Sequence, residues 1–399
     1  MKILQLCNKP PHPSVDGGSM AMDCITRGLL NAGHRVKVLA METDKHPMLR
    51  GRMSADYVEQ TQIESVYVDL GIKLVPAAVA MLCGESYHVK RYVSPDFAAK
   101  LKEVLQSGDF EVIHVESIFL TPYVPLIRKY SKAAVILRAH NVENLIWRQV
   151  AENARHGFKR WYLKHLALTL RAYELEHVND YDGVACITGI DADYFRRNGC
   201  RRPIEVIPFG IEPPPQPQVA SNPKALFHIG AMDWIPNQEG VAWLLEEVWP
   251  EIHRAVPEAR LYLAGRKMPE QWTAKTIPGV EVLGEVPDAA GFIADKQINI
   301  VPLLSGGGIR VKIIEAMSMG KTVVSTTVGA QGIDYIDGEH LLIADSPEAF
   351  AMQVKRCIDS PDYGREIGAA AARLIHDNYN TATLTARLIA FYNRIITKK

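Results

Sequence analysis

The chain has 399 residues, 47% of them apolar, which is enough for two or three domains that each bury a core. Lys and Arg together number 45, as do Asp and Glu, and this zero net charge argues against a dedicated nucleic-acid-binding protein. The six cysteines are scattered without zinc-ligand or redox spacing, and no apolar run reaches the length of a membrane span. We therefore expect a soluble, cytoplasmic protein without a signal peptide.

The first half of the chain alternates short apolar runs with helical patterns, which is typical of βαβ units around a parallel sheet. Strands are expected at residues 2–7, 35–41, 111–116, 133–140 and 183–188. Helices are expected at residues 19–33, 121–130, 143–178 and 191–199, the last with Asp191 as its N-cap. Four prolines between residues 213 and 217 then predict a stiff, extended connector, which is the best domain boundary in the chain.

The same alternation restarts after the connector. Strands are expected at residues 225–232, 259–266, 279–286, 298–304, 321–328 and 340–344. Helices are expected at residues 238–249, where Pro250 should end the helix, at 309–320, at 346–358 and over most of the C-terminal segment. The pattern predicts two doubly wound α/β domains, residues 1–198 and 219–381, joined by a proline-rich linker at 199–218.

The loop between the strand at 298–304 and the helix at 309–320 carries the most informative motif. Its three glycines are Gly306, Gly307 and Gly308. Glycines at a helix N-terminus let backbone amides approach a ligand, and such a site favours an anion. Arg310 and Lys312 follow on the first helical turn, where cations oppose the helix dipole unless an anion is bound there.

Glu315 completes this motif. It lies roughly 9 Å beyond Ile309 along the helix axis, and a carboxylate at that distance suits the vicinal diol of a ribose. Loop, cations and carboxylate together predict a site for a nucleoside diphosphate. The alternative is a flexible turn followed by a surface pair of Lys312 and Glu315. The position of the loop, at the carboxyl end of a strand in a doubly wound sheet, favours the ligand site.

Motifs from nearly the whole chain, in the right order, resemble those of a known family. The pattern G-x-R-x-K-x-x-E-A-M occupies residues 308–317, and the other motifs are VDGGSMAM, ITGIDADYF, VIPFGI, ARLYLAGR and GVEVLGEV. The chain resembles glycosyltransferase family 4, enzymes of the GT-B fold. The resemblance implies two Rossmann-like domains facing across a cleft, with helix 382–399 packing back on the first. It also implies retaining, metal-independent transfer of a sugar from a nucleoside-diphosphate sugar to an unidentified hydroxyl acceptor, in glycan or glycolipid biosynthesis.

The resemblance assigns roles to the glycine loop and its helix. Glu315 would hold the ribose hydroxyls, and Arg310 and Lys312 would neutralise the departing diphosphate. The family usually has a further acidic residue eight positions before this glutamate, but here the position is Gly307. We therefore expect backbone amides from Gly307 to Ile309 to contact the donor sugar.

Two further loops of the second half enter by the same resemblance. Backbone near Gly284 and Val286 is expected to contact the base of the donor. Many relatives place an Arg and a Lys after the strand at 225–232, whereas this chain has Asp233, Trp234 and Asn237. We expect Arg310 and Lys312 to take over the phosphate role, and Asn237 suits a helix N-cap.

The first half contributes its own candidate residues through the resemblance. Gly17 and Gly18 follow the first strand and open a helix, in a loop that approaches the donor phosphates and acceptor in the family. His140 follows a strand where the family often has a catalytic histidine facing the donor sugar. Asn141 and Glu143, in the same loop, are candidates for acceptor contacts. The alternatives are an ordinary turn for the glycines and a polar strand end for the histidine.

The partners follow from these assignments. A nucleoside-diphosphate sugar is expected as co-substrate, with a glycan, a lipid-linked molecule or a small molecule as acceptor, and with neither metal nor nucleic acid. Residues 151–171 are basic with an apolar stripe, so they could make transient contact with the inner face of a membrane. The interpretation we favour is a solvated helix with Trp161 packed inward.

Two other functions compete with a transferase. A nucleotide-sugar epimerase on the same fold would need additional acid–base carboxylates, which the sequence alone does not locate. A non-catalytic nucleotide-sugar-binding subunit is suggested by the missing acidic residue at Gly307.

Overall fold

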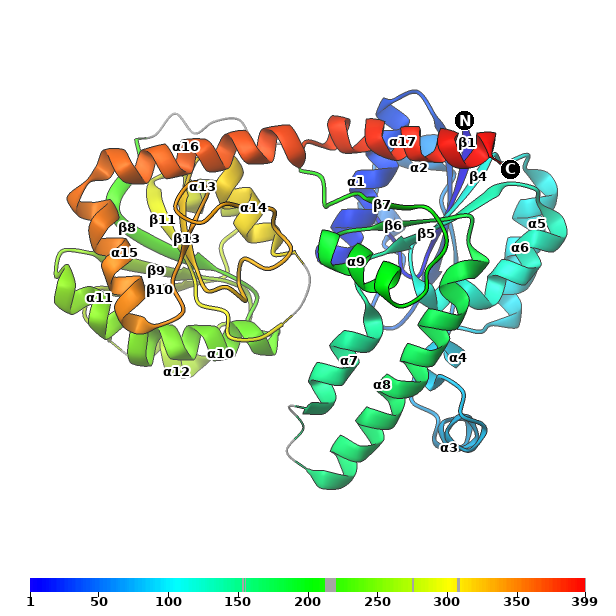
Figure 1. Cartoon of the computed structure of the whole chain (residues 1–399), viewed down its shortest axis with the longest axis horizontal. Coiled ribbons are helices and arrows are strands. Elements are labelled where there is room, and N and C mark those ends of the chain that lie inside the picture. The colour runs from blue at the N-terminus through cyan, green and yellow to red at the C-terminus, as the bar shows by residue number, and fades with distance from the viewer. Residues whose placement is uncertain (153, 155, 212–219, 275, 307–308, 399) are drawn as a thin grey trace. The chain divides into compact units, whose positions relative to one another are not determined.

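The computed structural model describes residues 1–152, 154, 156–211, 220–274, 276–306 and 309–398 (Figure 1). It divides into two compact units, Met1–Gly210 with Thr381–Lys399, and Ile211–Asn380. Each unit is a parallel sheet with helices on its faces, which confirms the predicted α/β class with two Rossmann-like domains. The proline-rich segment predicted as the connector lies largely outside the described residues.

The sheet of the first unit has the strand order β3-β2-β1-β4-β5-β6-β7, and all its pairs are parallel. Its strands are β1 (Lys2–Cys7), β2 (Arg35–Glu42), β3 (Glu64–Tyr67), β4 (Val112–Val115), β5 (Ala134–Ala139), β6 (Gly183–Cys186) and β7 (Ile204–Val206). The order reverses between β1 and β4, so ligands are expected outside the carboxyl ends of these strands. The edge strand β7 falls within the predicted linker, which therefore starts too early at residue 199. This short strand was missed because it stands so close to the prolines.

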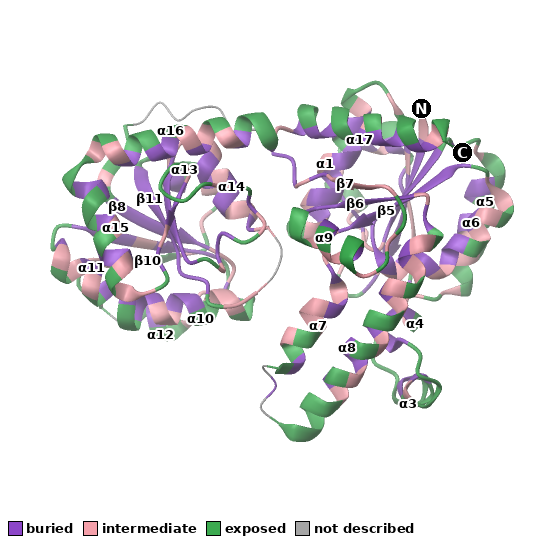
Figure 2. Cartoon of the chain, in the orientation of Figure 1, coloured by how far each residue is buried: buried purple, intermediate pink, exposed green. Residues whose placement is uncertain are grey.

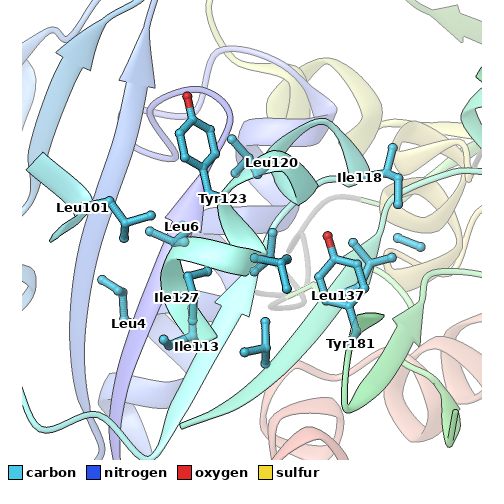
Figure 3. Packing of buried hydrophobic residues seen from close by; sticks show 14 of the residues in the cluster. Leu4, Leu6, Leu101, Ile113, Ile118, Leu120, Tyr123, Ile127, Leu137 and Tyr181 are labelled. Carbon is cyan, nitrogen blue, oxygen red and sulfur yellow. The ribbon is translucent and has the colours of Figure 1, made fainter. Parts of the chain in front are cut away.

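Helices cover both faces of this sheet, and each face has its own core. These helices are α1 (Gly17–Asn31), α2 (Ala55–Thr61), α5 (Pro95–Ser107), α6 (Val124–Tyr130), α9 (Gly189–Arg197) and α17 (Thr381–Thr397). The central strands are apolar on both faces because successive side chains point to opposite sides of a buried sheet. Figure 3 shows one core, where Leu101 of α5 and Ile127 of α6 pack with Leu4 and Ile113. On the other face α17 packs with α1 (Figure 1).

Four more helices form a helical extension of the first unit. They are α3 (Leu74–Cys83), α4 (Tyr87–Lys90), α7 (Glu143–Glu152) and α8 (Gly157–His177). A small apolar cluster joins α3, α4, α7 and α8. In Figure 1 the ends of α7 and α8 nearest their connection project away from the sheet.

The sheet of the second unit has the order β10-β9-β8-β11-β12-β13, again with only parallel pairs among the described strands. Its strands are β8 (Asn222–Ile229), β9 (Arg260–Ala264), β10 (Val280–Gly284), β11 (Lys296–Val301), β12 (Thr322–Ser325) and β13 (Leu342–Ile343). Its helices are α10 (Ile235–Trp243), α11 (Trp249–Ala255), α12 (Glu270–Thr273), α13 (Ala289–Ala294), α14 (Val311–Ser318), α15 (Pro347–Asp359) and α16 (Pro361–Asn378). The switch point lies between β8 and β11, which precede the loops to α10 and α14.

Three helix ends differ from the prediction. Pro250 does not end its helix, because it lies in the first turn of α11, where a missing N–H costs little. Asp191 is not an N-cap, since the hydroxyl of Thr188 accepts from the Asp191 amide at 3.0 Å. Asn237 lies inside α10, and its side-chain amide donates to a loop carbonyl. The helices themselves were predicted, but both N-caps lie three residues earlier than expected, at Thr188 and Trp234, and the chain continues as helix past Pro250.

Candidate functional site

In the second unit, the loop after β11 packs against the loop after β8. Gly306 has a φ of 107°, and a Cβ there would stand 2.9 Å from the Trp234 ring, so the position requires glycine. The guanidinium of Arg310 lies over the same ring, 5.2 Å from its centroid. Since β8 and β11 are the neighbouring central strands, this contact sits at the switch point of the sheet.

The predicted cations stand at the start of α14. Arg310 is its N-cap residue and is buried, which lowers the pKa of the guanidinium to about 10 and still leaves it charged at neutral pH. The Nζ atom of Lys312 lies 2.7 Å from Oε2 of Glu315. The structure thus contains the Lys312–Glu315 pair that the sequence left as an alternative to a ligand site. An anion at the loop would compete with Glu315 for the same ammonium group.

Two of the three predicted glycines, Gly307 and Gly308, lie outside the described residues. Ile309, directly after them, is half-buried. The amide contacts predicted for Gly307 to Ile309 therefore stay a prediction.

The loops after β9 and β10 come close to the loop after β8 through glycines. A Cβ on Gly265 would stand 1.7 Å from the carbonyl oxygen of Gly230, so no side chain fits there. The amide of Gly265 donates to the carbonyl of Gly284 over 2.7 Å. Gly284 has a φ of 68°, and Val286, two residues further, is half-buried. Gly284 and Val286, which were predicted to contact the base, therefore lie at the carboxyl ends of the parallel strands, as Gly306 does.

Arg266 adds a cation at this edge that the sequence analysis missed. Its Nη2 atom lies 3.1 Å from Oδ2 of Asp233, which joins the loops after β9 and β8. Both side chains are partly exposed, so the arginine remains accessible to a ligand. The signal in the sequence was an arginine after a strand-ending glycine, which by itself does not separate it from other surface arginines.

In the first unit, Gly17 and Gly18 form the first turn of α1. Asp16 is the N-cap and accepts from the amide of Ser19 at 2.8 Å. The ammonium of Lys9 lies 2.6 Å from Oδ1 of Asp16, and a Cβ on Gly18 would stand 2.9 Å from that ammonium. Burial acts to raise the pKa of Asp16, but the charge of Lys9, together with hydrogen bonds from Lys9 and the Ser19 amide, outweighs it and lowers the pKa to about 2. The turn therefore carries an ion pair that the glycine motif alone did not reveal.

His140 lies at the carboxyl end of β5 and is held by a buried carboxylate. Its Nε2 atom lies 2.8 Å from Oε2 of Glu116, which follows β4 and has no exposed surface. The side-chain amide of Gln5, on β1, donates to Oε1 of Glu116 over 2.6 Å. Burial acts to raise the pKa of Glu116, but His114 and His140 outweigh it and hold the pKa well below its ordinary value. Glu116 is therefore an anion inside the unit.

These contacts fix the hydrogen-bonding state of His140. Burial, with the charges of Arg138 and Lys9, lowers the pKa of this histidine in spite of Glu116, which raises it, so the ring is neutral at neutral pH. A neutral ring that donates from Nε2 to Glu116 keeps Nδ1 as an acceptor. His140 can thus accept a hydrogen bond from a substrate hydroxyl. The sequence could not show this, because Glu116 and His140 come from different strands.

The chain of polar contacts continues behind Glu116 to the C-terminal helix. The Nε2 atom of His114, on β4, lies 3.3 Å from Oε1 of Glu116. The hydroxyl of Tyr392, on α17, lies 2.6 Å from Nδ1 of the same ring. Burial raises the pKa of Tyr392 well above its ordinary value, so this hydroxyl keeps its proton and donates to Nδ1. The last helix of the chain therefore supports the residue that orients His140.

The loop after His140 carries a carboxyl group with an unusual pKa. Burial, and then the charge of Glu174, raises the pKa of Glu143 to about 8, while a hydrogen bond from Asn141 acts in the opposite direction. The backbone amide of Glu143 donates to Glu174 over 2.9 Å. Glu143 is therefore mostly protonated at neutral pH. The structure brings Asn141 and Glu143 together as the sequence analysis placed them, but as a neutral pair.

The favoured interpretation of residues 151–171 was wrong in one respect. Trp161 does not pack inward, because 54% of it is exposed on α8. The buried face of the helix is formed instead by Leu163, Leu166 and Leu170. Over the described part of the chain, no three His, Cys, Asp or Glu side chains gather as metal ligands would, and no helix is apolar over a length that could span a bilayer.

The fold and the loops at its switch points define a glycosyltransferase of the GT-B class, and comparisons with known proteins agree. The family described as Glycosyltransferase Family 4 matches residues 15–213, and the one described as Glycosyl transferases group 1 matches residues 223–360. The chain belongs to glycosyltransferase family 4.

Solved structures share the whole fold at low sequence identity. Sucrose-phosphate synthase from Thermosynechococcus elongatus has a TM-score of 0.71 at 15% identity, covering 100% of both chains. HepE from Anabaena in complex with UDP has a TM-score of 0.67 at 13% identity, covering 99% of this chain and 100% of its own. TarM from S. aureus, in a complex that includes UDP, has a TM-score of 0.68 at 10% identity, covering 98% and 100%.

A curated relative is an uncharacterized 44.6 kDa protein in the cps region of Klebsiella pneumoniae. Its sequence is 22% identical over 412 residues, which covers 95% of this chain and 97% of the relative.

Proposed function

We propose that this glycosyltransferase is retaining and metal-independent, and that it moves a sugar from a nucleoside-diphosphate sugar to a hydroxyl group in glycan or glycolipid biosynthesis. The observation that carries the donor assignment is the buried Arg310 at the N-terminus of α14, close to Gly306, where the Trp234 ring leaves no room for a side chain. A guanidinium and the backbone amides at a helix N-terminus both favour an anion, and a diphosphate would meet both at this end of α14. HepE with UDP-glucose, and the cps-region relative, support the donor class and the pathway.

The second unit would stabilise the leaving group. When the bond between the anomeric carbon and the diphosphate oxygen breaks, its electron pair leaves with the diphosphate. Arg310, Lys312 and the amides at the start of α14 stand where this negative charge develops, and fixed charges of this kind lower the barrier. The acceptor hydroxyl forms the new bond to the anomeric carbon and passes its proton to an oxygen of the departing diphosphate. Arg266 offers one more cation at the same edge.

The first unit would contribute His140 as an acceptor of a hydrogen bond from a substrate hydroxyl. The anion of Glu116 behind it favours the positive charge that develops on a sugar ring as its bond to the diphosphate breaks. Gly17 and Gly18 remain candidates for contact with the donor, and Asn141 for the acceptor.

The donor assignment can be tested by titration calorimetry with nucleoside diphosphates and their sugar conjugates. Glu315→Ala should weaken donor binding severalfold, because a carboxylate on two hydroxyls is lost. Glu366→Ala, an exposed carboxylate on α16, is the matched control and should bind as the parent does. Unchanged affinity in Glu315→Ala, or no heat from any nucleotide, would contradict the site.

A nucleotide-sugar epimerase is the second candidate, and Glu143 gives it support. Its pKa of about 8 makes it a carboxyl that can exchange a proton near neutral pH, which is what an epimerase needs. Incubation with a panel of nucleotide sugars, followed by mass spectrometry and separation of isomers, distinguishes the cases. Free diphosphate indicates a transferase, an isomeric nucleotide sugar indicates an epimerase, and binding without turnover indicates a non-catalytic subunit.

A further inference from the structure

Helix α3 is apolar along its whole length and yet lies on the surface of the first unit. Its ten residues, LVPAAVAMLC, carry no charge, and only Ala77 and Ala80 are buried. Leu74 is 82% exposed and Leu82 is 83% exposed, and Figure 2 shows the same helix largely in the colour of exposed residues. A helix that is apolar on every side is normally found in a protein core or in lipid. This exposure could not be predicted from the sequence, because an apolar run of this length is equally consistent with a buried helix.

A second exposed apolar group begins α8. Phe158 is 80% exposed and lies beside Trp161, with their ring centroids 5.9 Å apart. The two groups belong to one body, because Ala77 and Ala80 of α3 share an apolar cluster with Leu163 of α8. We call the two groups together the tip surface, and its members are Ile72, Leu74, Val75, Val79 and Leu82 with Phe158 and Trp161.

The tip surface carries positive charge beside its aromatic residues. Lys159, Arg160 and Lys164 alternate with Phe158 and Trp161 and are exposed. No carboxylate of the described residues lies within ion-pair distance of these three cations. Along α8 the first acidic residue is Glu174, which is buried far along the helix. Cations next to exposed aromatic and aliphatic side chains match the boundary between anionic headgroups and acyl chains.

We propose that the tip surface docks on a lipid bilayer with anionic headgroups, with α3 entering the headgroup–acyl boundary and the cations of α8 binding the headgroups. A protein partner would cover one side of α3, whereas exposed apolar residues lie on every side of the helix except the one with Ala77 and Ala80. A fluid lipid layer can cover all of these sides at once. A second copy of the chain would bring like charges together. This inference does not depend on which donor the enzyme uses.

Co-sedimentation of the full chain with phosphatidylcholine vesicles, with and without phosphatidylglycerol, tests the proposal. The chain should bind the anionic vesicles. The double variant Leu74→Glu with Leu82→Glu should reduce this binding by about tenfold or more, because charged side chains resist entering the boundary. Met352→Glu, which changes an exposed apolar residue on α15, is the matched control and should bind as the parent does.

Two further variants separate charge from apolar contact. A triple variant, Lys159→Ala with Arg160→Ala and Lys164→Ala, should lose most of the preference for phosphatidylglycerol. Trp161→Phe should remove the shift in tryptophan fluorescence that accompanies binding. Absence of binding to both vesicle types, or equal binding by the Leu74 and Leu82 variant, overturns the proposal. Self-association of the parent chain that this variant abolishes would assign the surface to a second copy instead. Calorimetry of the same variants with nucleotides reports the donor site separately.

Discussion

His140 depends on one buried carboxylate for its tautomer, and this dependence can be tested by a nearly isosteric change. Glu116→Gln removes the charge and presents an amide that can also donate, so Nδ1 of His140 is no longer fixed as the acceptor. Turnover should fall by about tenfold, with donor affinity little changed, because the role proposed for the ring is on the reacting sugar and not on the nucleotide. The charge of Glu116 raises the pKa of His140, so this pKa should fall further in the variant. NMR of the ring nitrogens can follow the change.

Tyr392→Phe provides the comparison for this change. It removes the hydroxyl that donates to His114 but leaves the contact between Glu116 and His140 in place. The folded state should lose about 1 kcal/mol, while turnover stays near that of the parent. If Glu116→Gln matches the parent in turnover, in pH profile and in ring tautomer, Glu116 has only a structural role.

Glu143 predicts a dependence of stability on pH. Its pKa rises from an ordinary value of 4.5 to about 8 in the folded chain, so the folded state holds a proton that the unfolded state releases above pH 4.5. Its contribution to stability is fully present below pH 4.5 and is lost as pH rises through 8. Glu143→Gln cannot ionise, so it should gain roughly 4 kcal/mol relative to the parent between pH 5 and pH 9.

Urea unfolding of the first unit across this pH range measures the effect of Glu143. Glu152→Gln, an exposed carboxylate at the end of the same helix, is the control and should follow the parent at every pH. Parallel pH curves for the parent and Glu143→Gln would show that Glu143 is ionised in the folded chain at neutral pH. The support that this residue gives to an epimerase would then disappear.

Among the loops, the contact of Gly306 with Trp234 predicts that a single methyl group disturbs the donor site. Gly306→Ala must place a Cβ 2.9 Å from the indole in a backbone conformation that other residues avoid, so the loop has to move away from Trp234. Affinity for a nucleoside diphosphate should fall about tenfold, because the amides and Arg310 lose their alignment. Gly338→Ala has a similar φ of 78° with nothing within 4 Å, so it carries the backbone strain alone. Calorimetry should show normal affinity for that control; an equal loss in both variants would trace the effect to strain.

The regular elements were largely predictable, because a parallel strand buried on both faces needs an uninterrupted apolar run. The helix after the glycines was also predictable, since the residues that carry its signal are adjacent. The contacts that complete the sites were not, because Trp234 meets Arg310, and Glu116 meets His140, only after strands distant in the sequence become neighbours. The exposure of α3 escaped prediction for a different reason. Apolar periodicity tells which residues avoid water, but it does not tell whether protein or lipid covers them.

The path of the chain through both units makes the first unit depend on the last helix. The chain leaves the first unit at Gly210 and re-enters it at Thr381, where α17 covers α1 and reaches His114 through Tyr392.

Leu388→Ala in α17 removes a fully buried side chain and should cost the first unit about 2–5 kcal/mol. The second unit has its own core and should keep its unfolding transition. Met352→Ala, at an exposed position of α15, should leave both transitions unchanged. Limited proteolysis identifies which unit opens first. Cleavage of Leu388→Ala beginning within residues 220–380 would show that α17 does not stabilise the first unit as its packing implies.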